Sequence, residues 1–260
     1  MYFKKIGFLH IPKCAGSSMS QSIFQHLGLS PTHISALSEE EPKKKWVVKK
    51  KSLEMRFAQN NLFLSGHLTY SDMVDLNREI IFTYLRDPLE RLVSLWTFNL
   101  TRSESAQALN NDPSLRRHYG STFKEYLEEV NPNGMSKNLL IDLIGLKEFS
   151  KITADSVNSV YSKIQKDLLV EKSLARLDFV FTKSPQEPIN WLSELGYFDK
   201  FNLPRSNSSS SKQVLKAGCS RDEFRQIVKA YTYLDYSFFN HANRKFYGDF
   251  NEVSIARSIS

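Results

Sequence analysis

The apolar positions at the start of the chain form a short continuous run and then change to a helical period. Residues 7–11 are mostly apolar, which is typical of a buried strand. Small and polar residues follow at 12–18, and apolar residues then recur at helical spacing over 19–27. Gly28 suits the position just after a helix. The pattern therefore predicts a strand, a loop and a helix.

Three later apolar runs predict further strands. The run at 80–85 is the clearest, because it is continuous, β-branched and aromatic, as in a strand buried on both faces. Shorter runs at 62–64 and 179–182 predict two more strands. Helical patterns separate these segments, which predicts an α/β fold with a mainly parallel central sheet. We expect a single domain over residues 1–260, with the last dozen residues frayed.

Asp87, Pro88 and Glu90 predict the start of a helix directly after the clearest strand. Asp87 suits the N-cap, Pro88 suits the first helical position, and Glu90 is placed to close a capping box. The apolar residues of 89–96 fall on one face of this helix, and Ser94 lies off that face.

The remaining segments are predicted as loops and helices. The predicted loops are 29–41 and 199–212, the predicted helices are 42–59, 185–195 and 220–247, and a broken helical pattern covers 101–178. Six lysines lie within residues 43–51, which are called the basic face below. This face is either a solvated helix surface or a contact for an acidic substrate.

The loop at 12–18 has the features of an anion site. A small-residue loop that ends at a helix N-terminus presents backbone N–H groups and a positive dipole end. Lys13 adds a cation, and Ser17 and Ser18 add hydroxyl donors. The alternative is a simple turn with a solvated lysine. The nucleotide P-loop pattern G-x-x-x-x-G-K-[ST] is absent, because Lys13 precedes Gly16.

Position and composition both favour an anionic ligand. Lys13, His67 and Arg86 each follow a predicted strand, and ligands of parallel sheets bind beyond the carboxyl ends of strands. The formal net charge of +7 favours nucleotides, acidic glycans, nucleic acid or anionic lipid as partners. Two cysteines, Cys14 and Cys219, exclude a disulfide framework and a cysteine-rich zinc site. Cys14 is either a reactive thiol or a small residue that fills the loop.

Three segments carry motifs in a fixed order. Residues 10–18, 66–67 and 86–94 read H-I-P-K-C-A-G-S-S, G-H and R-D-P-L-E-R-L-V-S. They resemble the 5′-phosphosulfate loop (usually H-I-P-K-T-G-G-T-S), the G-H and the 3′-phosphate motif (R-D-P-x-x-R-x-x-S) of sulfotransferases that use 3′-phosphoadenosine 5′-phosphosulfate (PAPS). The G-H resembles the carbohydrate branch, sulfotransferase family 2, which includes heparan and uronyl 2-O-sulfotransferases. Residues 205–209 resemble its late cofactor-contacting loop.

This resemblance implies a P-loop-like three-layer sandwich that transfers a sulfuryl group from PAPS to a carbohydrate hydroxyl, on a polysaccharide, oligosaccharide or glycolipid. The implied donor-binding residues are Lys13, Gly16, Ser17 and Ser18 at the 5′-phosphosulfate, Arg86 and Ser94 at the 3′-phosphate, and Asn207 and Ser208 over the nucleotide. The implied catalytic residues are His67, as the general base, and Lys13. Lys137 is a weaker substrate-binding candidate, since relatives often carry Arg there.

These residue types suit in-line sulfuryl transfer. His67, with a reference pKa of about 6.5, can accept the proton of the acceptor hydroxyl at neutral pH. Lys13 can stabilise charge on the bridging oxygen, and Arg86 offers a planar fork for phosphate. The scheme requires no metal ion. The other histidines, His10 among them, are expected to be structural, and Cys14 and Ala15 replace the usual Thr and Gly.

Two other functions stay open. One is a P-loop-like ATP-dependent kinase, which the missing G-K-[ST] disfavours, and the other is a non-enzymatic binder of acidic glycan through the basic face at 43–51. We expect a carbohydrate partner, no nucleic acid and no membrane span, and the oligomeric state is open. Animal relatives are Golgi membrane proteins, and this chain lacks their anchor. We therefore expect a bacterial cytoplasmic enzyme, the alternative being a Golgi lumenal domain without its anchor.

Overall fold

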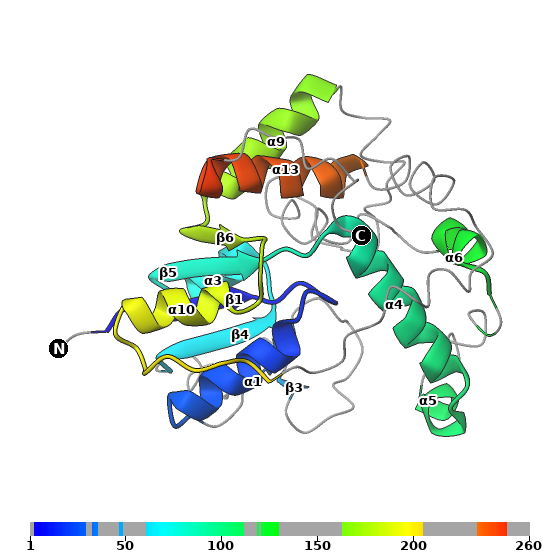
Figure 1. The fold of residues 1–260 in the computed structure, drawn as a ribbon, viewed down its shortest axis with the longest axis horizontal. Coiled ribbons are helices and arrows are strands. Elements are labelled where there is room, and N and C mark those ends of the chain that lie inside the picture. The colour runs from blue at the N-terminus through cyan, green and yellow to red at the C-terminus, as the bar shows by residue number, and fades with distance from the viewer. Residues whose placement is uncertain are drawn as a thin grey trace.

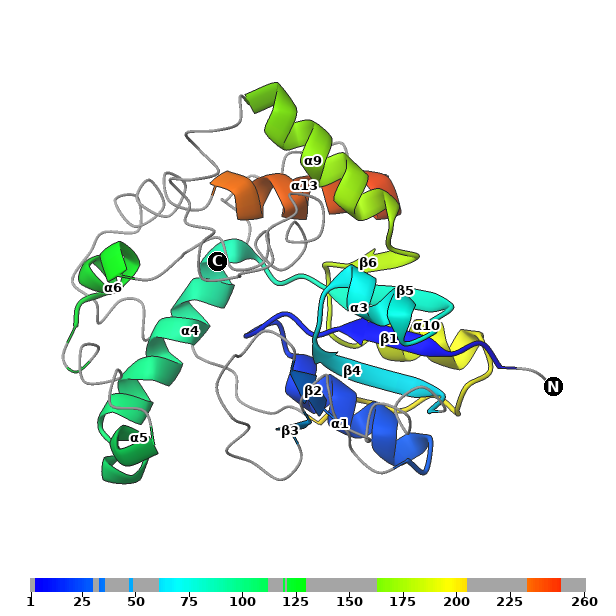
Figure 2. The ribbon, with the colours of Figure 1, turned by 180° about the vertical axis from the view of Figure 1, so that it is seen from behind.

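A parallel sheet forms the centre of the fold. The computed structural model describes residues 3–29, 33–35, 47–48, 61–111, 119, 121–129, 163–204 and 233–248. Within them, six strands form one sheet in the order β3-β2-β4-β1-β5-β6, and all neighbours are parallel (Figures 1 and 2). The strands are β1 (Ile6–Leu9), β2 (His33–Ser35), β3 (Val47–Val48), β4 (Phe63–His67), β5 (Ile80–Tyr84) and β6 (Phe179–Phe181). The predicted α/β class with a mainly parallel sheet is confirmed.

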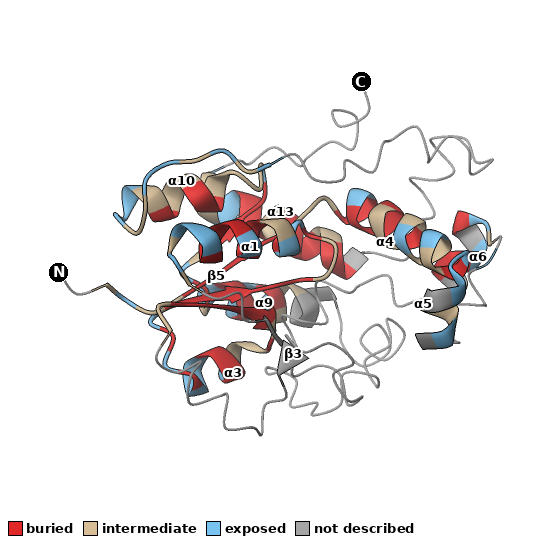
Figure 3. Cartoon of the chain, turned by 90° about the horizontal axis from the view of Figure 1, so that it is seen from below, coloured by how far each residue is buried: buried red, intermediate tan, exposed pale blue. Residues whose placement is uncertain are grey.

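Helices cover both faces of this sheet. The described helices are α1 (Gly16–His26), α3 (Tyr70–Asp75), α4 (Pro88–Ser103), α5 (Ala106–Asn111), α6 (Phe123–Glu129), α9 (Lys163–Ala175), α10 (Glu187–Glu194) and α13 (Tyr233–Tyr247). Figure 3 shows α1 and α10 on one face and α3 on the other. Helices α9 and α13 pack together beyond β6, and α4 runs away from the sheet toward α5 and α6 (Figures 1 and 2). None of the described helices is long and apolar enough to cross a membrane.

Two sequence predictions were wrong at the edge of the sheet. Strand β2 lies in the predicted loop at 29–41, and β3 lies in the predicted helix at 42–59. Both strands are very short, so no period marks them in the sequence, and they form by pairing with β4 and with each other. The β-branched pair Val47–Val48 also favours extended backbone over helix. Residues 30–32, 36–46 and 49–59 of these segments lie outside the described ranges.

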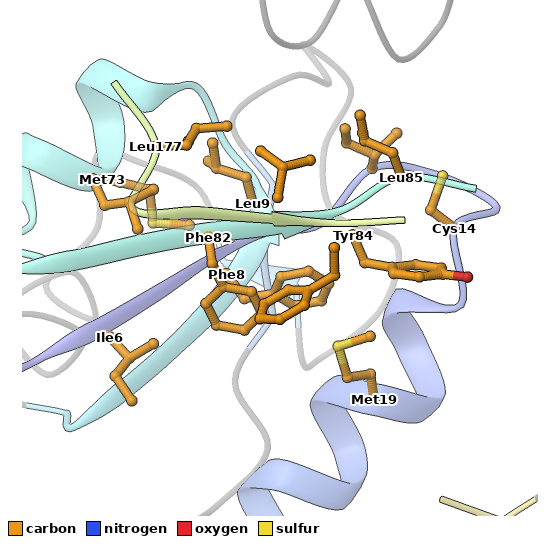
Figure 4. Packing of buried hydrophobic residues seen from close by; sticks show 14 of the residues in the cluster. Ile6, Phe8, Leu9, Cys14, Met19, Met73, Phe82, Tyr84, Leu85 and Leu177 are labelled. Atoms are coloured by element: carbon orange, nitrogen blue, oxygen red, sulfur yellow. The ribbon is translucent and has the colours of Figure 1, made fainter. Parts of the chain in front are cut away.

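The core lies between the sheet and its covering helices. The rings of Phe8 and Phe82 stack at 4.9 Å on one face, and Trp191 of α10 meets Phe82 edge-on at 5.6 Å. Figure 4 shows Met19 of α1 on this side and Met73 of α3 on the opposite side. Burial of apolar surface on both faces therefore holds β1 and β5 at the centre of the sheet.

Helix α4 has a smaller apolar cluster of its own. Its predicted apolar face is confirmed: Leu89, Leu92, Val93 and Trp96 are buried against the α6 residues Phe123, Tyr126 and Leu127. The helix is also tied to α13, because the Arg91 guanidinium lies 3.4 Å from the Asp235 carboxylate and both side chains are buried. Removing either partner of such a buried pair would leave an uncompensated charge and so destabilise the contact between α4 and α13.

Candidate active site

Three predicted site residues lie at one edge of the sheet. Strand β1 is flanked by β4 and β5, and Leu9 aligns with both Gly66 and Thr83. The carboxyl ends of these strands therefore lie side by side, and they lead into the loop with Lys13, to His67 and to Arg86. The sequence placed His67 in the segment after a strand, whereas it is the last residue of β4 itself. The side chains of this edge thus share the position where α/β sheets bind ligands.

The loop between β1 and α1 has a strained backbone. Lys13 and Ala15 have φ angles of 67° and 54°, in the left-handed region that non-glycine residues avoid. Such a conformation costs about 1–2 kcal/mol per residue. Ala15 occupies the position where the resembling motif has Gly, so the geometry gives a physical reason for glycine there. The strain persists because the neighbouring segments hold the loop in place.

The N-terminus of α1 has no side-chain cap. Ala15 is the N-cap residue and has no acceptor atom in its side chain, and the first turn contains no acidic residue. The Met19 N–H donates to the Ala15 carbonyl, while Ser17 and Ser18 stand in the first turn, exposed and half-buried. A helix end of this kind has a positive dipole end without a carboxylate to neutralise it. It is suited to a phosphate or sulfate group.

Gly16 is required by a close approach of His10. A Cβ atom at Gly16 would overlap the His10 imidazole, which is buried beneath the start of α1. Farther along the helix, the hydroxyls of Ser20 and Ser65 lie 2.6 Å apart and tie α1 to β4. The loop is therefore held at a fixed position relative to the end of β4, where His67 lies.

His67 is held in one orientation by the backbone of β1. Its Nδ1 lies 2.6 Å from the His10 carbonyl oxygen, and the two imidazole rings are 4.5 Å apart. A carbonyl oxygen only accepts, so Nδ1 carries the proton and Nε2 is the acceptor of the ring. Burial lowers the pKa of His67 below 6.5, and the hydrogen bond to His10 opposes this shift. The ring is therefore a neutral base at neutral pH.

Lys13 and Arg86 place two cations near each other. Burial lowers the pKa of Lys13, and the charge of Arg86 lowers it further. The Lys13 Nζ lies 4.0 Å from the centre of the Phe98 ring of α4. Arg86 makes an ion pair with Glu90, with 3.0 Å between Nε and Oε2. An anion bound between Lys13 and Arg86 would relieve their repulsion.

The start of α4 corrects one sequence prediction. Asp87 is the N-cap, as predicted, and its Oδ1 accepts from the N–H groups of Leu89 and Glu90 at 2.9 and 3.1 Å. The predicted capping box does not form, because the Glu90 carboxylate pairs with Arg86. This pair uses one of the five guanidinium donors of Arg86.

Cys14 joins the loop to the start of α4. The thiol is fully buried and accepts a hydrogen bond from the backbone N–H of Arg86. Burial raises the pKa of Cys14 to about 11, so the thiol stays protonated at neutral pH. Because the thiolate is the reactive form, this favours the loop-filling alternative over a reactive thiol.

Several predicted residues lie outside the described part of the chain. These are Asn207, Ser208, Lys137 and the lysines of 43–51. Ser94 is described, and it is half-buried on α4. Among the described residues, no group of three His, Cys, Asp or Glu side chains could hold a metal ion.

Two site residues escaped the sequence reasoning. The His10 ring contacts His67, and the Phe98 ring contacts Lys13. A signal for Phe98 exists in the sequence, because it follows Ser94 by four residues and so shares its side of α4. His10 precedes the loop directly, but its partner is 57 residues away and only strand pairing brings the two together.

The comparisons with known proteins decide the family. The sequence model of the sulfotransferase family matches residues 3–242. The chain belongs to the sulfotransferase family. No curated protein matches it. A crystal structure of a sulfotransferase from Alicyclobacillus acidocaldarius is similar over 93% of this chain and 96% of that one, with 14% identity and a TM-score of 0.46.

Family membership makes the chain a sulfotransferase, as predicted, and implies PAPS as the sulfuryl donor. It removes the kinase and the non-enzymatic binder as alternatives. The described site fits such a donor, because an uncapped helix end and two neighbouring cations are suited to phosphate and sulfate groups. The acceptor and the roles of individual residues stay predictions.

Proposed function

We propose that this sulfotransferase transfers a sulfuryl group from PAPS to a carbohydrate hydroxyl, with His67 as the general base. One observation supports this most strongly. His67 lies at the end of β4, and its Nε2 is the ring nitrogen that can accept a proton. The neighbouring loop carries Lys13 and leads into the uncapped N-terminus of α1. A base and an anion cradle therefore lie on adjacent strands.

The donor would bind across two strand ends. The 5′-phosphosulfate would be held by Lys13, Ser17, Ser18 and the backbone at Gly16. The 3′-phosphate would be bound by Arg86 and Ser94, and Asn207 and Ser208 would close over the nucleotide. When bound, PAPS supplies the sulfuryl group and a phosphate leaving group.

His67 and Lys13 would act on opposite sides of the transferred group. His67 Nε2 would take the proton of the acceptor hydroxyl, while the hydrogen bond from Nδ1 to the His10 carbonyl oxygen holds the ring in place. Lys13 would stabilise the negative charge that grows on the bridging oxygen. A preorganised donor of this kind contributes about 3 kcal/mol to transition-state stabilisation. These steps need no metal ion.

The carbohydrate acceptor is supported by charge and by motif. The net charge of +7 suits an acidic polysaccharide, and Gly66 and His67 match the G-H of the carbohydrate branch. Lys137 and the basic face at 43–51 are candidate acceptor contacts. The acceptor class, a single domain and a bacterial cytoplasmic location are predictions from the sequence.

Radioactive sulfuryl transfer tests this function directly. The purified enzyme would be incubated with ³⁵S-labelled PAPS and, separately, with uronate polysaccharides, neutral oligosaccharides and glycolipids. We expect labelled carbohydrate with at least one acceptor and, in His67→Ala, a loss of turnover of about 100-fold or more with donor-product binding retained. His26→Ala is the matched control, because His26 lies at the other end of α1 and is exposed. A fully active His67→Ala enzyme would reject the base assignment, and label on protein or small phenols alone would reject the carbohydrate acceptor.

A further inference from the structure

An exposed aromatic ring lies against Lys13 of the loop between β1 and α1. Phe98 is 44% exposed on α4, and the Lys13 Nζ stands 4.0 Å from its ring centre. The Arg102 guanidinium is 5.3 Å from the same ring. A single exposed phenylalanine needs no explanation, but one with two cations at its ring is an interaction.

The spacing along α4 gives the ring a place in the site. Ser94, Phe98 and Arg102 follow one another at intervals of four residues, so they share one side of the helix. Trp96 belongs to the buried side, where it meets Phe123 edge-on at 5.4 Å. Phe98 therefore lies on a firmly packed helix, one turn after Ser94, the candidate 3′-phosphate residue.

Lys13 needs such a partner for a physical reason. A lysine side chain has a flexible stem, so its ammonium group is poorly fixed without a contact. Burial and the nearby Arg86 both disfavour its charged form. The negative face of an aromatic ring attracts an ammonium group and acts against both effects.

We propose that Phe98 is a positioning residue for Lys13, its ring face holding the ammonium group charged and in place at the anion loop. The consequence for donor binding rests on the proposed function above. The contact between Phe98 and Lys13 is present in the free enzyme. The contact and its effect on donor binding can therefore be tested separately.

The first test observes the contact without any donor. Lysines of the full chain would be reductively methylated with ¹³C-formaldehyde, which keeps their charge, and the methyl resonances recorded by NMR. The Lys13 signal is the one lost in Lys13→Arg. We expect it to be shifted upfield by the ring, to move back toward the other lysines in Phe98→Leu, and to stay shifted in Phe98→Tyr. A Lys13 signal at the ordinary lysine position, or one unchanged in Phe98→Leu, would overturn the proposal.

The second test measures the consequence for the ligand. Binding of 3′-phosphoadenosine 5′-phosphate, the donor product, would be titrated calorimetrically, and kcat and KM would be measured. We expect Phe98→Leu to weaken binding and lower kcat/KM by about two- to fivefold, with Phe98→Trp and Phe98→Tyr close to the parent enzyme. In a Lys13→Met background, Phe98→Leu should have no further effect. An equal loss in that background would show that the ring acts through packing and would overturn the proposal.

Failure of this proposal and failure of the proposed function give different results. If PAPS is not used, the enzyme binds no donor product, yet the upfield Lys13 signal still appears. If the ring has no role, the donor product binds and the Lys13 signal is unshifted. Thermal unfolding midpoints of the Phe98 variants would confirm that each is folded.

Discussion

Two helices begin beside each other at the carboxyl edge of the sheet, and their N-termini are built in opposite ways. Helix α4 is satisfied internally, because Asp87 caps two N–H groups and Pro88 has none to cap. Helix α1 follows a strained loop, and the side chain of its N-cap residue Ala15 has no acceptor atom. Both segments resemble phosphate motifs. In the proposed function, backbone groups at α1 would therefore bind one phosphate together with Lys13 and the neighbouring serines, whereas only side chains, those of Arg86 and Ser94, would bind the other.

Gly16→Ala should give the largest loss at the α1 end. The added Cβ overlaps the His10 ring, so either the loop or the ring must move. Overpacking of this kind costs about 1–3 kcal/mol, and we expect donor-product affinity to fall by about 10- to 100-fold in calorimetric titration. Gly28→Ala is the matched control, since a Cβ there meets nothing while φ is +64°. It should lower the unfolding midpoint and leave binding unchanged. Equal binding losses in both variants would contradict a local role for Gly16.

Arg86→Ala should separate the two phosphate sites. Charged hydrogen bonds contribute about 1.5–3 kcal/mol, so the affinity for 3′-phosphoadenosine 5′-phosphate should fall by about 10- to 100-fold. The affinity for adenosine 5′-phosphate, which lacks the 3′-phosphate, should hardly change. Ser17→Ala should instead weaken both ligands to the same extent. Equal losses for both nucleotides in Arg86→Ala would mean that Arg86 does not bind the 3′-phosphate.

The pH profile tests His67, the proposed base at the end of β4, next to the loop that leads into α1. Burial lowers the pKa of His67, so the neutral ring persists below pH 6.5 and becomes protonated only as the pH falls further. We therefore expect kcat/KM, which reports the pKa of the free enzyme, to be constant down to pH 6.5 and to fall about tenfold per pH unit below the shifted pKa. Steady-state kinetics from pH 5 to 8 would show this loss of activity. A loss that already begins above pH 6.5 would contradict the environment described for His67.

The sequence predicted those parts of the fold that have strong local signals. The strand at Ile80–Tyr84 and the start of α4 at Pro88 follow from a continuous apolar run and from Asp87, Pro88 and their neighbours. Strand β2 was missed because pairing with β4, not its own three residues, defines it. The site shows the same division. The predicted parallel order brought Lys13, His67 and Arg86 to one edge, whereas the contact between the His10 and His67 rings depends on the pairing of β1 with β4, two strands that are far apart in the sequence.

Asp87→Ala should change stability more than binding. The side chain accepts two N–H bonds at the start of α4, and loss of an N-cap typically costs about 1 kcal/mol. We expect a lower free energy of unfolding by about this amount in urea titrations, with donor-product affinity reduced less than about threefold. Asp87→Asn, which can still cap, should recover most of the stability. A large binding loss with unchanged stability would show that Asp87 acts on the ligand instead.

Glu90→Gln should give the smallest effect, and in the opposite direction. Glu90 occupies the Arg86 Nε at 3.0 Å, and this half-exposed pair competes with any phosphate that Arg86 binds. Exposed ion pairs contribute only about 0.2–1 kcal/mol, so the donor-product affinity should rise by about two- to fivefold. Glu104→Gln is the matched control, because it makes the same charge change at the far end of α4. A gain in Glu90→Gln alone would show that Arg86 is released for the phosphate, and an equal gain in both would reduce the effect to net charge. An unchanged affinity would mean that Arg86 binds phosphate without leaving Glu90, so that the start of α4 presents its arginine already positioned by its own helix.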